Sequence, residues 1–538
     1  MRKHHIILLI ILLSIIANFI MLYPKLDYSP VPTQWAVGID WGRYYILSEG
    51  KIYEKEYNAL TWQSGMKMYG CVDILPKILF AVINMVIGTI NFPEDLKFYY
   101  TFPWSGTVFL PLLMLFWYLY ISKKEGKFNS FDCFLLIFLS IFPLASAVEP
   151  VSGNTNSSGI ARVFFFLMVI LFIIIFTEKK RNTMILGIFI FLLFPFFYYY
   201  HTWSYYFAIN LTAIGFFTLF KKNERYITSL TNLGIITFIT SAIYYNSLLM
   251  EEPIRIYKKF PQLLVNFPSV SFTMKVNPEL LGYSPLGSTY SYIQLVNSAL
   301  IVSICLIFFW KYLSFRKEAK PYENLLFYFL IAQSFIALAL FFWDGILGVY
   351  ARSFEVLIYI CMLLSAYLLV KSEEKLKTTI RFILLCAVCL CIISYLTVPH
   401  ELNRSLTNEE FVGIRFAGTH IPKTSYIFSD FRLGTPLIYF DQLGIITIDA
   451  PHRSPQITEE TLERCYYNIT DPEMILDNII HKPDYYFITS SHQSEVYLLD
   501  PSLKQFKPPS TDFQGEWAKQ EAFNKLYSSE YFDIFQRR

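Results

Sequence analysis

The chain has 538 residues, of which 54% are hydrophobic and only 16% are charged. Soluble domains usually carry about a quarter charged residues, so this chain has too few to cover a globular surface. The formal net charge of +3 is small and lacks the strongly basic character of a nucleic-acid-binding protein, so we expect no nucleic-acid partner. The composition predicts an integral membrane protein.

Apolar runs of about 20 residues can cross the roughly 30 Å of hydrocarbon in a bilayer as helices. In chain order such runs lie near 6–23, 98–121, 131–147, 159–177, 183–200, 203–220, 227–249, 291–313, 324–343, 353–370 and 380–398. The first run also fits a signal peptide, but Tyr23, Pro24 and Lys25 replace the small residues of a cleavage site. We therefore expect it to be retained as a span.

Basic clusters decide whether a further apolar stretch, 74–92, also crosses the membrane. Short loops rich in Lys and Arg mark the cytoplasmic side. The clusters are Arg2-Lys3, Lys123-Lys124 with Lys127, Lys179-Lys180-Arg181, Lys221-Lys222 with Arg225, Arg316-Lys317 with Lys320, and Lys371 with Lys375 and Lys377. All of them are cytoplasmic only if 74–92 lies along the outer face instead of crossing. About eleven spans then place the N-terminus in the cytoplasm and the C-terminus outside the cell membrane.

This topology divides the chain into two domains. Residues 1–398 form a polytopic α-helical membrane domain with long outer loops at 24–73 and 250–289. Strand-like runs at Ser425–Phe428, Gly444–Ile448 and Tyr485–Thr489 then alternate with helical patterns at Pro436–Leu443 and Pro472–Ile480. Such alternation is typical of an α/β unit with a largely parallel sheet. We expect 399–538 to be an extracytoplasmic α/β domain that serves as a cap or recognition domain.

The first outer loop carries residues suited to chemistry. The stretch GIDWGRYYILSEGKIY, residues 38–53, places Asp40 close to Arg43 and Tyr44 soon after the first span. A carboxylate held at the outer membrane face can act as a general base or bind a divalent cation. A solvated loop carboxylate is the alternative, because exposed loops commonly carry Asp.

Several sequence motifs follow Asp40 along the chain. SEGKIY at 48–53 precedes the juxtamembrane stretch, which closes in GTINFP at 88–93, and the next span ends in basic residues. The tail ends in an aromatic strand-like run, Glu530–Phe535. In outline and over the whole chain, this order resembles the GT-C class of membrane glycosyltransferases, which includes protein O-mannosyltransferases, aminoarabinose transferases of lipid A and oligosaccharyltransferases. The resemblance implies an inverting enzyme that moves a sugar from a polyprenyl-phosphate-linked donor to a protein, lipid or glycan acceptor at the outer face.

The resemblance also implies roles for residues matched by position. Asp40 corresponds to the acidic residue that serves as base or metal ligand, and Glu149 to a second acidic ligand of a divalent cation such as Mg²⁺ or Mn²⁺. Arg352 stands where a span begins and is suited to hold the lipid phosphate. Arg43, Tyr44 and Arg162 are the further candidates for substrate binding. The tail lacks the WWDYG sequence of oligosaccharyltransferases, and the first loop lacks the Asp-Glu pair of protein mannosyltransferases, so the motifs do not support either specific activity.

Each candidate has a structural alternative. Arg162 can anchor its span at the interface, Arg352 can pair with Asp344 or Glu355, and Glu149 can be a loop carboxylate. The aromatic stretch 198–203 is most simply an interfacial belt, with a sugar-stacking wall as the functional alternative.

Two rival functions remain. A transporter or flippase would place ionisable residues near the membrane midplane and often shows repeated halves. The predicted spans are almost free of charge and no internal repeat is visible. A catalytically inactive scaffold with the same architecture is the other alternative.

Overall fold

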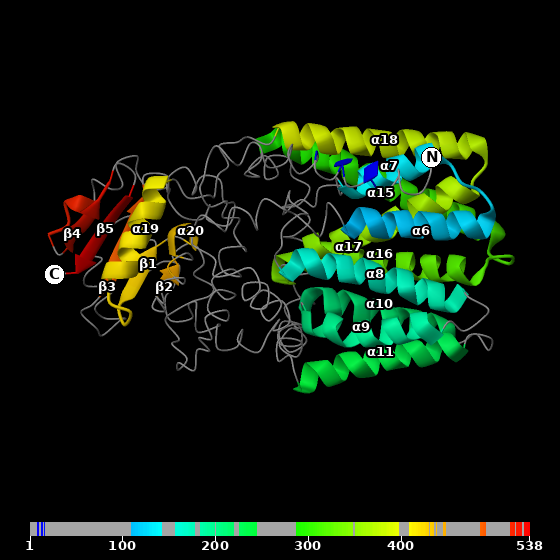
Figure 1. Cartoon of the computed structure of the whole chain (residues 1–538), viewed down its shortest axis with the longest axis horizontal. Coiled ribbons are helices and arrows are strands. Elements are labelled where there is room, and N and C mark those ends of the chain that lie inside the picture. Colours follow the sequence, from blue (N-terminus) through cyan, green and yellow to red (C-terminus); the bar gives the residue numbers. More distant parts are fainter. Residues whose placement is uncertain are drawn as a thin grey trace. The chain divides into compact units, whose positions relative to one another are not determined.

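The structure is a computed structural model. It describes residues 8, 9, 12, 13 and 16 and the ranges 109–141, 157–177, 183–199, 201–219, 225–244, 287–347, 350–397, 408–429, 431–434, 437, 445–447, 485–490, 517–521, 523–529 and 532–537. Contacts group the described elements into a helical unit, from α6 to α18, and an α/β unit, from α19 to β5 (Figure 1).

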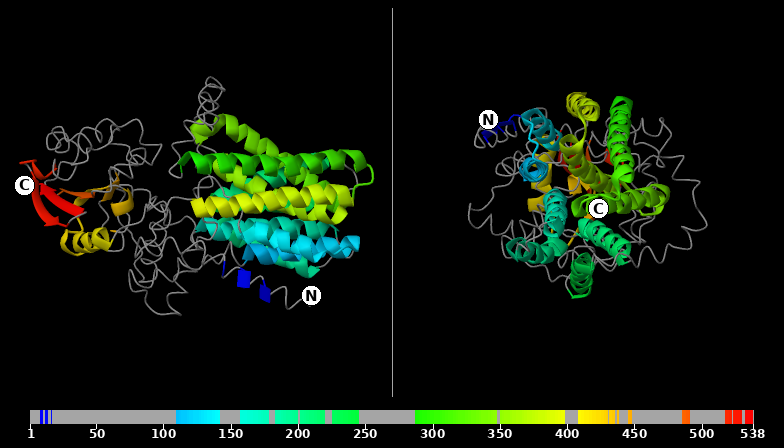
Figure 2. Two further views of the ribbon diagram at one scale, coloured as in Figure 1. Left: turned by 90° about the horizontal axis from the view of Figure 1, so that it is seen from above. Right: turned by 90° about the vertical axis from the view of Figure 1, so that its right-hand side faces the viewer.

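Helices that run side by side make up the helical unit (Figure 2). They are α6 (Leu110–Glu125), α7 (Ser130–Ile141), α8 (Ser157–Thr177), α9 (Thr183–Tyr199), α10 (His201–Leu219), α11 (Arg225–Tyr244), α15 (Gly287–Phe315), α16 (Pro321–Leu347), α17 (Tyr350–Lys371) and α18 (Glu374–Thr397). Each predicted span from 98–121 onward coincides with one of these helices. The stretch 74–92 lies outside the described residues, as do most residues of the predicted first span.

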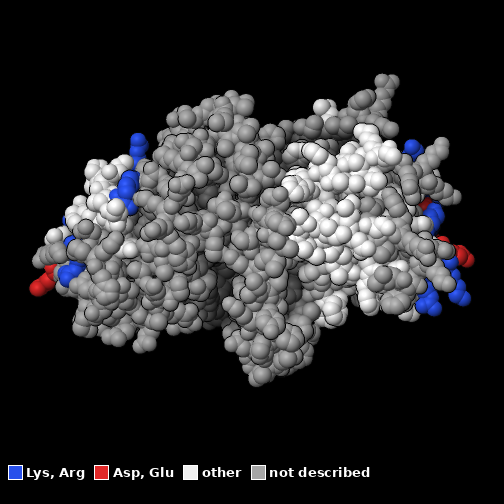
Figure 3. Space-filling view, turned by 90° about the horizontal axis from the view of Figure 1, so that it is seen from below, with Lys and Arg blue, Asp and Glu red and all other residues white. Residues whose placement is uncertain are grey.

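The outer helices of this unit expose large apolar side chains. Trp310 is 78% exposed, Phe191 76% and Phe335 73%, on α15, α9 and α16. In Figure 3 the described atoms along the visible side of the helical unit are white, and charged side chains gather at one of its ends. Exposing such large apolar side chains is unfavourable in water but not in contact with lipid tails.

A membrane span requires a long apolar helix. Among the described helices, the stretch Glu374–Ile393 qualifies, with 20 residues and a mean hydropathy of 2.2. Further apolar helical stretches, including Val356–Lys371, have 10–17 residues. Ten of the eleven predicted spans therefore correspond to described helices, and the crossing of each remains a prediction.

Helix α17 is the buried element of the unit. Every residue from Val356 to Val370 is buried, and the helix contacts α6, α7, α15, α16 and α18. A helix that is apolar on all sides belongs in the interior. On the α6 side, the Trp117 indole Nε1–H donates to the Leu363 carbonyl at 3.1 Å. This buried hydrogen bond fixes α6 and α17 relative to each other.

The α/β unit contains α19 (Asn408–His420), α20 (Phe431–Gly434) and a mixed sheet. Its strands are β1 (Tyr426–Ser429), β2 (Ile445–Thr447), β3 (Tyr485–Ser490), β4 (Phe523–Ser528) and β5 (Phe532–Arg537). They are ordered β2-β1-β3-β5-β4, with β2, β1 and β3 parallel and the last two pairings antiparallel. The three predicted strands and the aromatic C-terminal strand are present. The short link between β4 and β5 makes an antiparallel hairpin, so the sheet is less parallel than predicted.

Two layers cover the sheet. Helix α19 approaches one face so closely that a Cβ on Gly413 would meet the Phe532 ring. On the other face Phe487 stacks on Phe428, with ring centroids 4.9 Å apart, and packs against Trp517 at 4.3 Å. Of the predicted helical pattern at 436–443, the described Leu437 lies in a short helical turn, and 472–480 lies outside the described residues.

Candidate functional site

The predicted site residues fall into two groups. Asp40, Arg43, Tyr44 and Glu149 lie outside the described residues, so their roles remain predictions. Arg162 and Arg352 lie in the N-terminal turns of α8 and α17, and the Arg162 side chain is 3% exposed. Among the described residues no group of three His, Cys, Asp or Glu side chains could hold a metal ion. The predicted divalent cation depends on Asp40 and Glu149 and is untested.

The helix contacts place Arg162 and Arg352 at the same end of the helical unit. The C-terminal end of α8 meets the last turns of α6, where Tyr120 and Thr177 share a hydrogen bond. The C-terminal end of α17 meets the same turns, because Lys371 lies 3.5 Å from Glu125. The N-terminal ends of α8 and α17 therefore both lie at the opposite end. Between the two ends, the rings of Phe166 and Tyr359 contact each other, with centroids 5.8 Å apart.

An aromatic layer lies next to Arg162 toward the middle of the unit. Trp203 of α10 is fully buried and packs against Phe165 at 5.5 Å and Tyr359 at 5.9 Å between ring centroids. The predicted interfacial belt is therefore wrong for Trp203, and so is a sugar-stacking wall. The indole is a core residue because α8 and α17 surround it.

The opposite end holds an ionic network that the sequence did not predict. Glu125, at the end of α6, pairs with Lys320 and Lys371 and accepts a hydrogen bond from the Tyr322 hydroxyl at 2.6 Å. Glu323 lies 3.4 Å from the same Lys371 and is 1% exposed. Its carboxylate accepts from the Lys320 backbone N–H at 2.7 Å, which caps the start of α16.

A hydrogen bond completes this network. The Tyr367 hydroxyl donates to Glu323 at 2.8 Å, so α17 contributes both a cation and a donor to the same carboxylate. The network thus joins the ends of α6 and α17 to the beginning of α16. The available sequence signal was the basic residues of the loops, but their acidic partners are distant in the chain.

The neighbours of Glu125 shift the pKa of its carboxyl group. Burial alone would raise its pKa, but the hydrogen bonds from Lys320 and Tyr322 and the charge of Lys371 outweigh burial and lower it. Glu125 is therefore ionised in the folded protein at neutral pH, and it pairs with Lys320 before α16 and with Lys371 at the end of α17.

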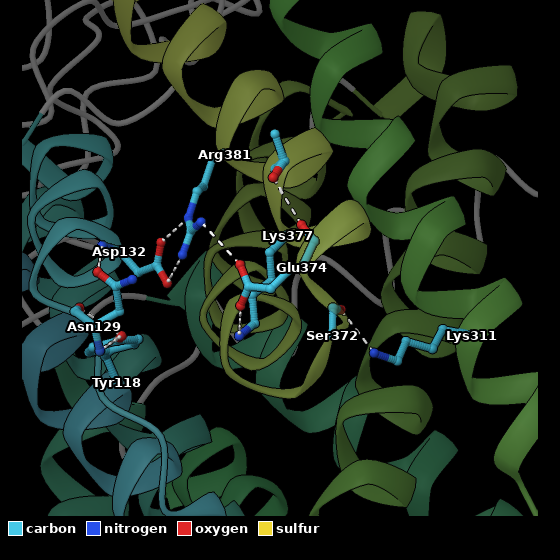
Figure 4. Close-up of polar contacts among 9 residues, drawn as sticks. Tyr118, Asn129, Asp132, Lys311, Ser372, Glu374, Lys377 and Arg381 are labelled. Atoms are coloured by element: carbon cyan, nitrogen blue, oxygen red, sulfur yellow. Dashed lines mark hydrogen bonds and ion pairs between the residues drawn. The ribbon is translucent and has the colours of Figure 1, made fainter.

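A second cluster of charged side chains lies at the same end (Figure 4). Arg381 of α18 makes two hydrogen bonds to Asp132 of α7, at 2.6 and 3.1 Å. Lys377 pairs with Glu374 at 3.0 Å. Beside these residues is a cavity of about 490 Å³, bordered by the loop between α6 and α7 and by the loop between α17 and α18.

Comparisons with known proteins support the fold. No protein-family model and no curated protein matches the sequence. The crystal structure of the apo oligosaccharyltransferase of Archaeoglobus fulgidus matches with a TM-score of 0.59 at 11% identity, covering 92% of this chain and 71% of that one. ArnT of Cupriavidus metallidurans bound to undecaprenyl phosphate matches with a TM-score of 0.53 at 9% identity, covering 99% and 98%. The predicted resemblance is confirmed at the level of the fold: this chain has a GT-C-like fold.

The lowered pKa of Glu125 predicts an acid-dependent loss of stability. A carboxyl whose pKa is lower in the folded state contributes stability above its ordinary pKa of 4.5 and loses it as the pH falls through the folded value. The thermal midpoint of the purified protein should therefore fall as the pH drops below 4.5, and Glu125→Gln should flatten that part of the profile. Glu318→Gln, an exposed change in the same loop region as Lys320, should leave the profile unaltered. An unaltered profile in Glu125→Gln would contradict the assignment.

Proposed function

We propose that this protein is an inverting glycosyltransferase that moves a sugar from a polyprenyl-phosphate-linked donor to an acceptor at the outer face of the cell membrane. The observation that carries the proposal is the likeness, over 99% of the chain, to an ArnT structure bound to undecaprenyl phosphate. The match supports the donor class, while sugar and acceptor stay open.

The two arginines at one end of the helical unit suit a lipid-linked phosphate. A phosphate diester carries a negative charge that must be balanced where lipid headgroups meet the protein. A guanidinium can bind two phosphate oxygens at once and stays charged when partly desolvated. Arg352 is our first candidate for this contact, and Arg162, buried beside the aromatic layer, supports the same anion from α8.

Transfer also requires activation of the acceptor. The donor's anomeric carbon already carries a good leaving group, the phosphate. A carboxylate on the face of the sugar opposite the phosphate can remove the acceptor's proton as the new bond forms, which gives inversion. We assign this role to Asp40, directly or as a ligand of a divalent cation shared with Glu149. Arg43 and Tyr44, close to Asp40 in sequence, are proposed to contact the donor.

The distribution of charge supports the orientation. Lys123, Lys320, Lys371 and Lys377 all belong to the end opposite Arg162 and Arg352, where charged residues gather in Figure 3. Basic loops face the cytoplasm. We therefore propose that the arginine end is the outer face and that 399–538 is extracytoplasmic.

Asp40→Asn should abolish transfer while folding and membrane insertion survive, because the side chain keeps its shape and loses its charge. A positioned carboxylate typically contributes about 10²- to 10⁴-fold in rate. Purified variant and wild type would be assayed with a polyprenyl-phosphate sugar and a cell extract that supplies acceptors. Wild-type activity in Asp40→Asn would refute the assignment. Loss of wild-type activity with a chelator and its return with Mg²⁺ or Mn²⁺ would favour the metal-ligand role, and Glu149→Gln should then lose activity as well.

Arg352→Lys should weaken donor binding even though it keeps the positive charge, because the ammonium cannot form the paired contacts of a guanidinium. Arg352→Ala should weaken it further. Donor affinity would be measured directly with labelled polyprenyl-phosphate sugar. Lys375→Arg, at an exposed lysine of α18 outside the ionic network, is the control and should bind the donor normally. Unchanged affinity in Arg352→Ala would remove Arg352 from the site.

The proposed membrane orientation can be tested by labelling introduced cysteines. A cysteine introduced at Ser510 should react with a membrane-impermeant reagent added from outside, and one introduced at Lys222 should react only after the membrane is opened. The reverse pattern would overturn the orientation and, with it, the position of the proposed site.

A further inference from the structure

The cavity of about 490 Å³ lies at the end of the helical unit that is opposite Arg162 and Arg352. It is therefore separate from the proposed donor site. Its lining comes from two helix-connecting segments, Gly126–Asn129 and Ser372–Glu374, and from Tyr118, Asp132, Leu369, Val370 and Lys377. Helix ends of a membrane protein lie at the depth of lipid headgroups, so the cavity opens into that layer.

One rim of the cavity has a well-defined backbone. Gly126 ends α6 in the left-handed conformation, with φ of 68°, and the Lys127 N–H donates to the Ser122 carbonyl at 3.1 Å. The Asn129 side chain caps α7 by accepting from the Phe131 N–H at 2.8 Å. The Tyr118 hydroxyl also donates to the Asn129 carbonyl at 2.9 Å. Lys127 thus projects from a loop that is fixed on both sides.

The other rim joins α17 to α18. Ser372 is buried and accepts a hydrogen bond from the Lys311 ammonium at 2.9 Å. The next two residues, Glu373 and Glu374, are exposed at the cavity. The Lys377 side chain is only 11% exposed, whereas its partner Glu374 is 76% exposed, so this ion pair is open to competition from another anion.

The charges that line the cavity are not all neutralised. Arg381 occupies both oxygens of Asp132, and Lys377 pairs with Glu374. The side chains of Lys127 and Glu373 make no direct hydrogen bond or ion pair within the described part of the chain, and they interact only at longer range, Lys127 with Glu374 and Glu373 with Lys311. One cation and one carboxylate therefore line the same cavity without a direct hydrogen bond or ion pair to the described part of the chain. This arrangement suits a ligand that carries both a negative and a positive charge.

We propose that the cavity binds the headgroup of phosphatidylethanolamine. Lys127 and Lys377, from opposite rims, would contact the phosphate, and Glu373 would accept hydrogen bonds from the primary ammonium. A quaternary ammonium has no N–H to donate, so a choline headgroup lacks the second contact. Phe128, which is 53% exposed at the rim, is placed to contact the glycerol and first acyl carbons.

The test uses the purified full-length protein in detergent with short-chain phosphatidylethanolamine, phosphatidylcholine and phosphatidylglycerol as probes. Bound lipid would be counted by native mass spectrometry, and affinity would be measured by titration. We expect phosphatidylethanolamine to bind at least about tenfold more tightly than either of the others, which is about 1.4 kcal/mol. Lys127→Gln and Glu373→Gln should each remove that preference.

Matched variants separate the cavity from general surface charge. Lys375 lies in the first turn of α18 and does not line the cavity, and Glu318 is an exposed carboxylate at the same end. The variants Lys375→Gln and Glu318→Gln should both bind the lipids like the wild type. Far-UV circular dichroism and a monodisperse elution would check folding. Equal binding of all three lipids would overturn the proposal, as would a preference that survives in both Lys127→Gln and Glu373→Gln. Because binding is measured without sugar transfer, the result is independent of the proposed function.

Discussion

Apolar side chains gain little by leaving lipid for another helix, so apolar contact alone cannot fix how the helices of this protein align. The alignment depends on polar ties, meaning hydrogen bonds and ion pairs between side chains of different helices. Arg381 and Asp132 join α18 to α7, and Glu323 with Lys371 joins α16 to α17. Nearer the middle, the Asn210 amide donates to the Gln333 side chain at 2.8 Å and joins α10 to α16. Each tie has a single geometry that satisfies it, because an unsatisfied polar group in hydrocarbon is strongly unfavourable.

The polar contacts of α17 also bear on the opposite end of the helical unit. Lys371 is held by Glu125 and Glu323, and Trp117 holds α17 at Leu363. Sliding α17 by one helical turn, about 5.4 Å, would break all of these contacts. The ionic network at one end therefore determines the height of the N-terminal turns of α17 at the other end, where Arg352 lies. A network far from the proposed chemistry thus positions a residue that the chemistry needs.

The sequence predicted the parts of this structure that depend on local composition. Helices appear where long apolar runs were found, and β1, β2, β3 and β5 appear where β-branched and aromatic residues cluster. Strand β4 was missed because most of its residues are exposed and polar. The pairing of Asp132 with Arg381 could not be predicted, since 249 residues separate them. Trp203 was misplaced because an aromatic residue near a span end looks the same in sequence at an interface or in a core.

The burial of α17 has a consequence for the surrounding bilayer. From Arg352 to Lys371 the helix rises roughly 28 Å at about 1.5 Å per residue, close to the hydrocarbon thickness of about 30 Å. Since Val356–Val370 are enclosed by protein, hydrophobic mismatch acts on the outer helices, through residues such as Phe191 and Trp310, and not on α17 itself. In a thinner or thicker membrane the lipid must deform around the protein, while the spacing between its two polar ends stays constant.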